Sequence, residues 1–227
     1  MRSAIVYFLV AGSALLSLSL VAKWVTEIRV KISRQAKRLQ AAIVRVEEMA
    51  THDMLTGALN RRVGTELAEA ELRQVERQAA HFCVALLDLD HFKQINDGRG
   101  HQVGDAVLVA LADHVRAQLR QVDKVARWGG EEFLILLPSV TLEQAQVALD
   151  RVRDGFAALR LVQHPDLCAT FSVGLAQARA GDTLEHLLER ADHALYEAKR
   201  QGRNRCVAEA PSRDGPASVA STPEFTS

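Results

Sequence analysis

The sequence has no excess of charge of either sign. It contains 28 Lys and Arg and 28 Asp and Glu, so its bulk charge gives no indication of a nucleic-acid partner. Cysteines are few, and Cys83, Cys168 and Cys206 are odd in number, far apart and without the paired spacing of a zinc site. We therefore expect reduced thiols in a cytosolic domain, and no nucleic acid.

Two common nucleotide-binding motifs are also missing. The chain has no Gly-x-x-x-x-Gly-Lys-Ser/Thr phosphate loop, and Gly98-x-Gly100-x-x-x-Gly104 misses the dinucleotide fingerprint by one residue. Any nucleotide must therefore be held in another way.

The N-terminal end has the composition of a membrane anchor. Residues 4–22 carry no formal charge, and a helix of that length spans roughly the 30 Å of a hydrocarbon core. The alternative, a secretory signal peptide, lacks an A-x-A-like site before Lys23. Seven Lys or Arg and only Glu27 follow up to Arg45, so the positive-inside rule places the rest of the chain in the cytoplasm. We predict an uncleaved anchor over residues 1–23, with too few residues before it for an external sensor domain.

A seven-residue repeat follows the anchor. Its two positions are occupied by Val25, Ile32, Leu39 and Val46, and by Ile28, Gln35, Ala42 and Met49. This spacing favours a parallel coiled coil, which Gln35 and Ala42 would weaken. The alternative is a single amphipathic helix on anionic lipid. We predict a dimerising coiled-coil stalk over residues 24–50.

The globular part alternates apolar patterns with turn signals. The patterns predict a helix from Asn60 to about Ala79, a buried strand from Phe82 to Leu87, a loop over His91 to Gly104, a helix through Val107 to Leu119, a hairpin at Gly129-Gly130, a helix over Leu142–Leu159, a strand over Thr170–Ala176 and a helix from Leu184 to Ala198. The order is a helix followed by βαββαβ, an α+β sheet with helices on one face. Residues 208–227, rich in Pro, Ser, Gly and Ala, are predicted to be a disordered tail.

Carboxylates stand at two points of this pattern. Asp88 and Asp90 end the first buried strand, and Glu131 and Glu132 follow the two glycines that a primed hairpin turn would use. Because the hairpin would lie beside that strand, Asp88 and Glu131 would form a hard-oxygen site suited to Mg²⁺. The alternative is that these carboxylates are merely solvated or ion-paired.

Several longer runs together resemble the signature of GGDEF-domain diguanylate cyclases. They are Leu87 to Asp97, Gly100 to Asp105 and Arg127 to Phe133, preceded by Asp53-x-Leu55-Thr56 and Asn60-Arg61-Arg62 and followed by Ala198-Lys199-x-x-Gly202-Arg203-Asn204. The resemblance covers residues 51–207, and Glu131 stands where many members carry Asp. It implies a cyclase that condenses two GTP into cyclic di-GMP and releases two pyrophosphates, with two domains facing each other in a homodimer.

The resemblance also implies roles for individual residues. Asp88, the carbonyl of Leu89, Glu131 and Glu132 would hold two Mg²⁺ ions per active site, or Mn²⁺, and Glu131 would help to deprotonate the attacking 3′-hydroxyl. The implied substrate-binding residues are Phe92, Asn96, His101, Asp105, Lys199 and Arg203. Lys93 would stabilise charge in the transition state. The residues alone leave Lys93 as a solvated lysine, and Asp105, Lys199 and Arg203 as side chains favoured by helix macrodipoles.

A product-inhibition site is implied at Arg120 and Asp123, with Arg151 as a second arginine. The assignment rests on the position of Arg120-x-x-Asp123 just before the hairpin and not on its spacing, because Arg151-x-x-Asp154 and Arg179-x-x-Asp182 have the same spacing. A guanidinium suits the task because it bonds phosphate bidentately and stacks on guanine.

The leading hypothesis is a homodimeric diguanylate cyclase anchored by one helix in a bacterial inner membrane, with a possible regulatory protein at the stalk. One alternative is a non-catalytic cyclic di-GMP receptor that signals through its stalk. The other is a cyclase of relaxed base choice, against which Asp105 argues, because a carboxylate can accept from both N–H groups on guanine's pairing edge.

Overall fold

The structure, a computed structural model, describes residues 23–24, 29, 31–35, 37, 39–40, 50–78, 80–161 and 164–210. The chain divides into two compact units, Met1–Ala50 and Thr51–Ser227. Almost all of the predicted anchor, much of the predicted stalk and the tail beyond residue 210 lie outside the described residues. Among those that are described, no helix is long and apolar enough to cross a membrane.

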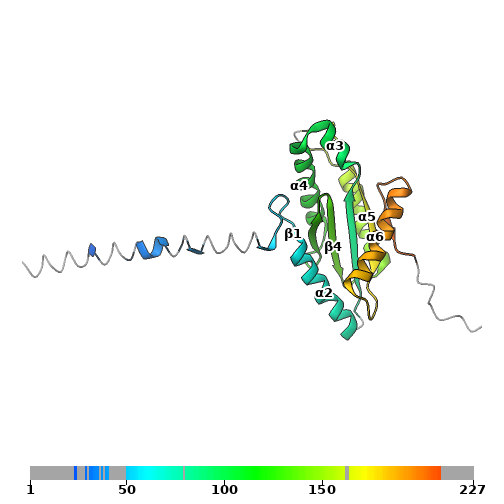
Figure 1. Cartoon of the computed structure of the whole chain (residues 1–227), viewed down its shortest axis with the longest axis horizontal. Helices are drawn as coiled ribbons and strands as arrows, with labels where there is room; N and C mark the ends of the chain where they lie inside the picture. The colour runs from blue at the N-terminus through cyan, green and yellow to red at the C-terminus, as the bar shows by residue number, and fades with distance from the viewer. Residues whose placement is uncertain are drawn as a thin grey trace, which may run out of the picture. The chain divides into compact units, whose positions relative to one another are not determined.

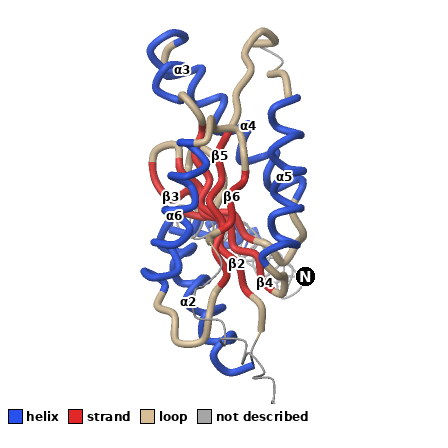
Figure 2. The backbone as a smooth tube through the Cα atoms, turned by 90° about the vertical axis from the view of Figure 1, so that its right-hand side faces the viewer, coloured by secondary structure: helices blue, strands red, loops and turns tan. Residues whose placement is uncertain are grey.

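The second unit is built on a mixed six-stranded sheet (Figures 1 and 2). Its strands are β1 (Leu59–Asn60), β2 (Phe82–Leu89), β3 (Lys124–Gly129), β4 (Glu132–Pro138), β5 (Phe171–Gln177) and β6 (Cys206–Ala208). The spatial order is β1-β3-β4-β2-β5-β6, with parallel pairing at both edges and antiparallel pairing between the inner strands. The predicted hairpin therefore does lie beside the first long strand.

The helices of this unit are α2 (Arg61–Gln78), α3 (Phe92–Arg99), α4 (His101–Gln118), α5 (Leu142–Ala158) and α6 (Leu184–Arg200). They cover both faces of the sheet, so the expectation of helices on one face is wrong. On β2, Cys83, Ala85 and Leu87 pack in one core with α4 and α5, while Phe82, Val84 and Leu86 pack in a second with α2 and α6. A strand whose residues are all buried has two apolar faces, and each needs a cover.

The segment from His91 to Gly104, predicted to be a loop, is largely helical. It forms α3 and the first turn of α4, which meet at Gly100, where φ is +85°. Only Phe92 and Ile95 of α3 are buried, so the segment has too few apolar residues for a helical pattern to stand out. Asp105 consequently lies in the second turn of a helix rather than at its start.

The hairpin turn differs from the prediction by one residue. Gly129 pairs with Glu132, so the two turn residues are Gly130 and Glu131, and only the first of them needs positive φ, at +45°. A bulge between Arg127 and Gly129 takes up the extra residue. Glu131 is therefore a turn residue and not the first residue of a strand.

Candidate functional site

Two carboxylates face each other at one end of the central strands. Asp88 of β2 is the pairing partner of Glu132 of β4, and Asp88 is only 8% exposed. Lys199 of α6 places its Nζ 2.8 Å from Oδ2 of Asp88. Burial raises the pKa of Asp88 against the opposing effect of Lys199, and burial together with the Asp88 charge raises the pKa of Glu132. The pair therefore forms a concentration of negative charge that a cation would stabilise.

The turn that carries Glu131 is fastened to the same strand end. The backbone N–H of Leu89 donates to the carbonyl of Glu131 over 3.4 Å, next to Asp88. The structure thus brings together Asp88, Leu89, Glu131 and Glu132, the four residues that the sequence assigned to metal ions. Within the described ranges no three His, Cys, Asp or Glu side chains form a ready metal cluster. A small set of hard oxygens fits Mg²⁺, which completes its coordination with water and substrate phosphates.

Asn96 of α3 carries an unsatisfied polar atom. Among the described residues, its Oδ1 is the one buried side-chain atom without a hydrogen-bond partner. It packs against Gly104 of α4, where any Cβ would overlap it. Buried polar atoms are nearly always paired in folded proteins, so this oxygen marks a place where a ligand N–H or O–H could donate.

The other predicted substrate residues are distributed over the adjoining elements. Lys93 is exposed on α3, and His101 and Asp105 are exposed in the first two turns of α4. The helix α3 lies beyond the end of the sheet (Figure 2), whereas α4 packs along one face of it. Phe92 is 9% exposed and belongs to the core. Arg203 follows α6, and its charge acts to lower the pKa of Asp88.

Asp90 directly follows β2, and its hydrogen-bond partners differ from those of Asp88 and Glu132. Its carboxylate accepts hydrogen bonds from Thr170 Oγ1 and Ser172 Oγ, both at 2.7 Å, and from the backbone N–H of Asn204 at 3.0 Å. It is 4% exposed. Asp90 therefore links β2 to β5 and to the segment after α6, a structural role that an Asp-x-Asp spacing does not reveal.

Arg127 connects the turn at Gly130 and Glu131 with the beginning of the domain. Its Nε and Nη2 donate to the carbonyl of Gly130, at 3.0 and 2.8 Å, and its Nη1 lies 3.0 Å from Oδ1 of Asp53. Burial would raise the pKa of Asp53, but hydrogen bonds from Thr56 and Arg127 outweigh it and lower the pKa. The sequence analysis assigned no role to this arginine.

Two of the predicted product-inhibition residues, Arg120 and Asp123, are hydrogen-bonded to each other. Arg120 Nη2 lies 2.6 Å from Asp123 Oδ1, its Nε lies 3.1 Å from Oδ2, and its Nη2 also donates to the carbonyl of Pro138. Both residues line a pocket of about 470 Å³ between the α4–β3 loop and residues 52–59. Arg151 is exposed on α5, outside the lining of this pocket.

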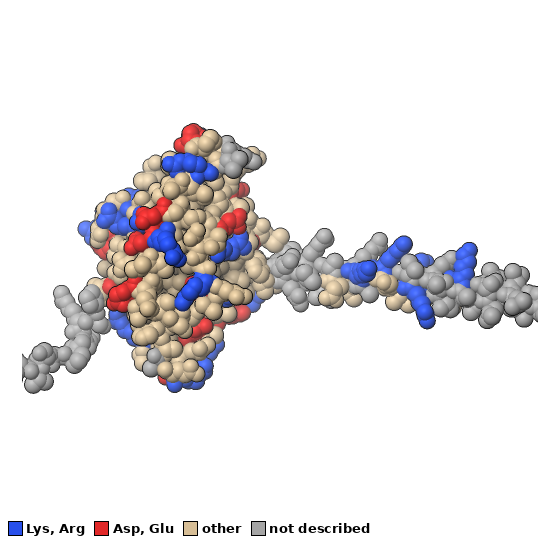
Figure 3. Space-filling view, turned by 180° about the vertical axis from the view of Figure 1, so that it is seen from behind, with Lys and Arg blue, Asp and Glu red and all other residues tan. Residues whose placement is uncertain are grey.

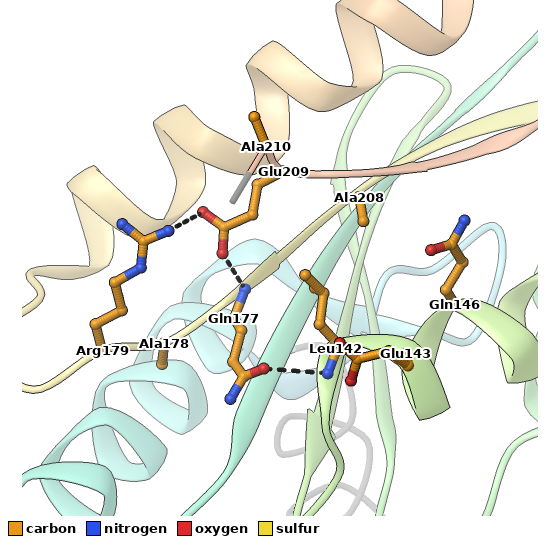
Figure 4. A pocket seen from close by; sticks show the side chains of 9 residues that line it. All are labelled: Leu142, Glu143, Gln146, Gln177, Ala178, Arg179, Ala208, Glu209 and Ala210. Atoms are coloured by element: carbon orange, nitrogen blue, oxygen red, sulfur yellow. Dashed lines mark hydrogen bonds and ion pairs between the residues drawn. The ribbon is translucent and has the colours of Figure 1, made fainter. Parts of the chain in front are cut away.

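A pocket of about 450 Å³, lined in part by Gln177 and Glu209 (Figure 4), lies at the end of the sheet away from Asp88. Gln177 accepts from the backbone N–H of Leu142, and the carboxylate of Glu209 accepts from Gln177 N and Arg179 Nη2. Arg190 Nε adds a third donor to Glu209 at 2.7 Å. The carboxylate of Glu209 is thus neutralised by Arg179 and Arg190, which favours a structural role for the residues that line this pocket.

Charged side chains are mixed on the described surface. On the face seen in Figure 3, acidic and basic groups are interspersed over the second unit. The distinctive charge arrangement is therefore local, at Asp88 and Glu132.

A family profile described as "Diguanylate cyclase, GGDEF domain" matches residues 50–205. Over 175 residues the chain is 40% identical to the diguanylate cyclase DgcP of Pseudomonas aeruginosa, covering 77% of this chain. The chain spans less than half the length of the first curated relatives it matches, 26% of DgcP and 41% of the Escherichia coli diguanylate cyclase DgcM.

Solved structures also match the chain. The coiled coil and GGDEF domain of DgcB from Caulobacter crescentus, in complex with c-di-GMP, matches with a TM-score of 0.72 at 32% identity, covering 80% of this chain and 98% of that one. Diguanylate cyclase SiaD in complex with its activator SiaC, from Pseudomonas aeruginosa, matches with a TM-score of 0.68 at 37% identity, covering 91% and 82%. The chain belongs to the GGDEF-domain diguanylate cyclase family.

Proposed function

We propose that the domain is a diguanylate cyclase, which condenses two GTP into cyclic di-GMP and releases two pyrophosphates. The observation that carries the proposal is Asp88 facing Glu132 on neighbouring strands, beside the turn that holds Glu131. Family membership and the names of the curated relatives support it.

The carboxylates suit a pair of divalent ions. Asp88, the Leu89 carbonyl, Glu131 and Glu132 would hold two Mg²⁺, or Mn²⁺ in their place. When bound, the ions neutralise the triphosphate and act as Lewis acids at the α-phosphate. Lys199 and Arg203 would bind the phosphates, and Lys93 would stabilise charge that grows in the transition state.

The reaction joins two nucleotides by two equivalent steps. In each, the 3′-oxygen of one GTP bonds to the α-phosphorus of the other, and the bond to pyrophosphate breaks. Glu131 accepts the 3′-hydroxyl proton, directly or through water. Because one domain supplies one GTP, two domains must face each other, and we propose a homodimer.

Recognition of guanine would come from α3 and α4. Asp105 would accept from both N–H groups of the pairing edge, which adenine cannot match. Asn96 would use its unsatisfied oxygen, and Phe92 and His101 would complete the surroundings of the nucleotide. This arrangement disfavours a cyclase of relaxed base choice.

The N-terminal residues would anchor and dimerise the enzyme. We propose a single pass through a bacterial inner membrane by residues 1–23, a coiled-coil stalk over 24–50, and the catalytic domain over 51–207 in the cytoplasm, followed by a disordered tail over 208–227. The uncharged run, the basic residues after it and the heptad repeat support this arrangement. We also propose a regulatory protein at the stalk, which is supported by the structure of the similar protein SiaD in complex with its activator SiaC.

The enzyme test uses the full-length chain in detergent, with GTP and Mg²⁺, and identifies products by mass. Wild type should form cyclic di-GMP, and Glu131→Gln should lose about 100-fold or more in rate because it removes a metal ligand and proton acceptor. Glu143→Gln, an exposed glutamate on α5, is the matched control and should keep the wild-type rate. A wild type that forms no product but binds cyclic di-GMP tightly, once carried-over ligand is removed, would make the domain a receptor.

Product inhibition is proposed at Arg120, Asp123 and Arg151. Arg120→Ala should leave initial turnover intact and abolish inhibition by cyclic di-GMP, because it removes the guanidinium that would bind the product phosphate. Arg179→Ala is the control, since Arg179 has the same Arg-x-x-Asp spacing but pairs with Glu209 near the β6 edge of the sheet, away from β3. Inhibition curves that coincide for Arg120→Ala and wild type would remove this assignment.

A further inference from the structure

Three consecutive residues after α6 have positive φ angles. Gly202, Arg203 and Asn204 have φ of +111°, +62° and +45°. The first ends the helix in a Schellman motif, with Arg203 N donating to the carbonyl of Ala198 and Gly202 N to that of Lys199. Glycine adopts this conformation freely, but Arg203 and Asn204 do so at a cost in free energy. The surrounding structure must therefore hold these two residues in place.

Two side chains from other elements hold Asn204. Asp90, directly after β2, accepts its backbone N–H at 3.0 Å, and Arg153 of α5 donates from Nη1 to its carbonyl and to its Oδ1, at 3.0 and 3.1 Å. Both are themselves fixed. Asp90 is buried against Thr170 and Ser172, and the Arg153 side chain, 16% exposed, is paired with Asp150 and Asp154. The residue after Arg203 is thus bonded at three atoms, two in its backbone and one in its side chain.

The held segment adjoins the carboxylate pair. Asp90 directly follows β2, the strand that carries Asp88, so the segment is bonded next to the site. Arg203 stands between Asn204 and the end of α6, where Lys199 places its Nζ 2.8 Å from Oδ2 of Asp88. A change in the backbone of Asn204 would therefore move the guanidinium of Arg203 relative to the site.

We propose that Asp90 and Arg153 are positioning residues, which hold the loop over 202–204 in its left-handed conformation and so aim Arg203 at the triphosphate of GTP. Neither residue touches the substrate in this role. The inference rests on the proposed function, in which Arg203 binds phosphate, and extends it to a residue on α5.

The test is kinetic and uses the full-length chain with GTP and Mg²⁺, while a phosphodiesterase removes cyclic di-GMP. Arg153→Met should raise KM for GTP about 3- to 10-fold and change kcat less than about twofold, because it weakens a charge-assisted phosphate contact without removing it. Arg160→Met, two residues after the same helix and bonded only to local carbonyls among its described contacts, should leave both constants unchanged. Arg203→Met should raise KM at least as much as Arg153→Met.

The double variant Arg153→Met/Arg203→Met tests whether Arg153 affects KM by positioning Arg203 or by a separate effect on the fold. If Arg153 acts through Arg203, adding Arg153→Met to Arg203→Met should raise KM by less than about twofold further. Asp90→Asn is a supporting variant, but it alters a buried group and can lower stability, so the decision rests on Arg153.

Each outcome decides the matter. A KM unchanged by Arg153→Met, beside a raised KM for Arg203→Met, would overturn the inference and leave the proposed function standing. Effects that multiply in the double variant would also overturn it, because Arg153 would then act elsewhere. A KM unchanged by Arg203→Met would remove the phosphate role itself, and the inference with it.

Discussion

At the scale of single residues, three polar side chains near the end of β2 differ in role because their partners differ. Asp88 pairs with a lysine and faces another carboxylate, which leaves it available to a cation. Asp90, two positions on, is fully engaged with hydroxyl and backbone donors. Asn96 has a buried oxygen that the described protein does not satisfy. Chemical type alone would not separate these roles.

The three thiols should differ sharply in reactivity. Burial raises the pKa of Cys83 and Cys206 to about 12, while Cys168 is exposed. We expect a thiol reagent at about pH 8 to label one cysteine per folded chain, since only the thiolate reacts. Labelling should be counted by mass spectrometry.

Cys168→Ser is the control and should abolish labelling of the folded protein. Denaturant should then expose two thiols in that variant. Rapid labelling of Cys83 or Cys206 in the folded chain would contradict the burial described for them.

At the scale of elements, α6 is the helix that brings Lys199 to Asp88. Its first turn is capped by Thr183, whose side chain accepts from His186 N, and its length sets where Lys199 falls. Its packing on β5 depends on Gly174, where any Cβ would overlap the carbonyl of Ala191 and the backbone N of Leu195. The close approach of helix and strand therefore requires a residue without a side chain.

Gly174→Ala should lower the free energy of unfolding by about 3 kcal/mol, because backbone atoms cannot move aside as a flexible side chain would. Urea titration followed by circular dichroism would measure it. Gly98→Ala is the matched control, since a Cβ there meets nothing within 4 Å, and it should be neutral or stabilising by about 0.5 to 1 kcal/mol. Equal midpoints for the two variants would contradict the packing of α6 on β5.

At the scale of the whole molecule, the proposed chemistry needs two domains, and the proposed stalk would hold them together. Deleting residues 1–50 should lower specific activity in dilute enzyme by about tenfold or more, because the two half-sites must then meet by diffusion. Raising the enzyme concentration should restore it. The measurement is initial rate against enzyme concentration.

The full-length chain is the reference, and its specific activity should be independent of concentration over the same range. Specific activity of the shortened chain that did not change on dilution would show that residues outside the stalk dimerise the domain.

The sequence determined the order of the long helices and strands, the central hairpin and the family, because these depend on local apolar periodicity and on motifs of fixed spacing. The short edge strands β1 and β6 were not predicted. It missed α3, where only two residues are buried, and the helices on both faces, because a continuous apolar strand does not say how many layers cover it. The sequence also did not predict that the turn residues are Gly130 and Glu131, because the bulge before Gly129 shifts the pairing register of the hairpin.

The tertiary structure alone decided which polar groups meet. Asp88 and Glu132 are 44 residues apart and Asp90 and Asn204 are 114 apart, and strand register and helix packing bring each pair together. The same holds for Arg153 and Asn204. Sequence spacing carries information about neighbours along one element, whereas contacts between elements depend on how the whole core packs.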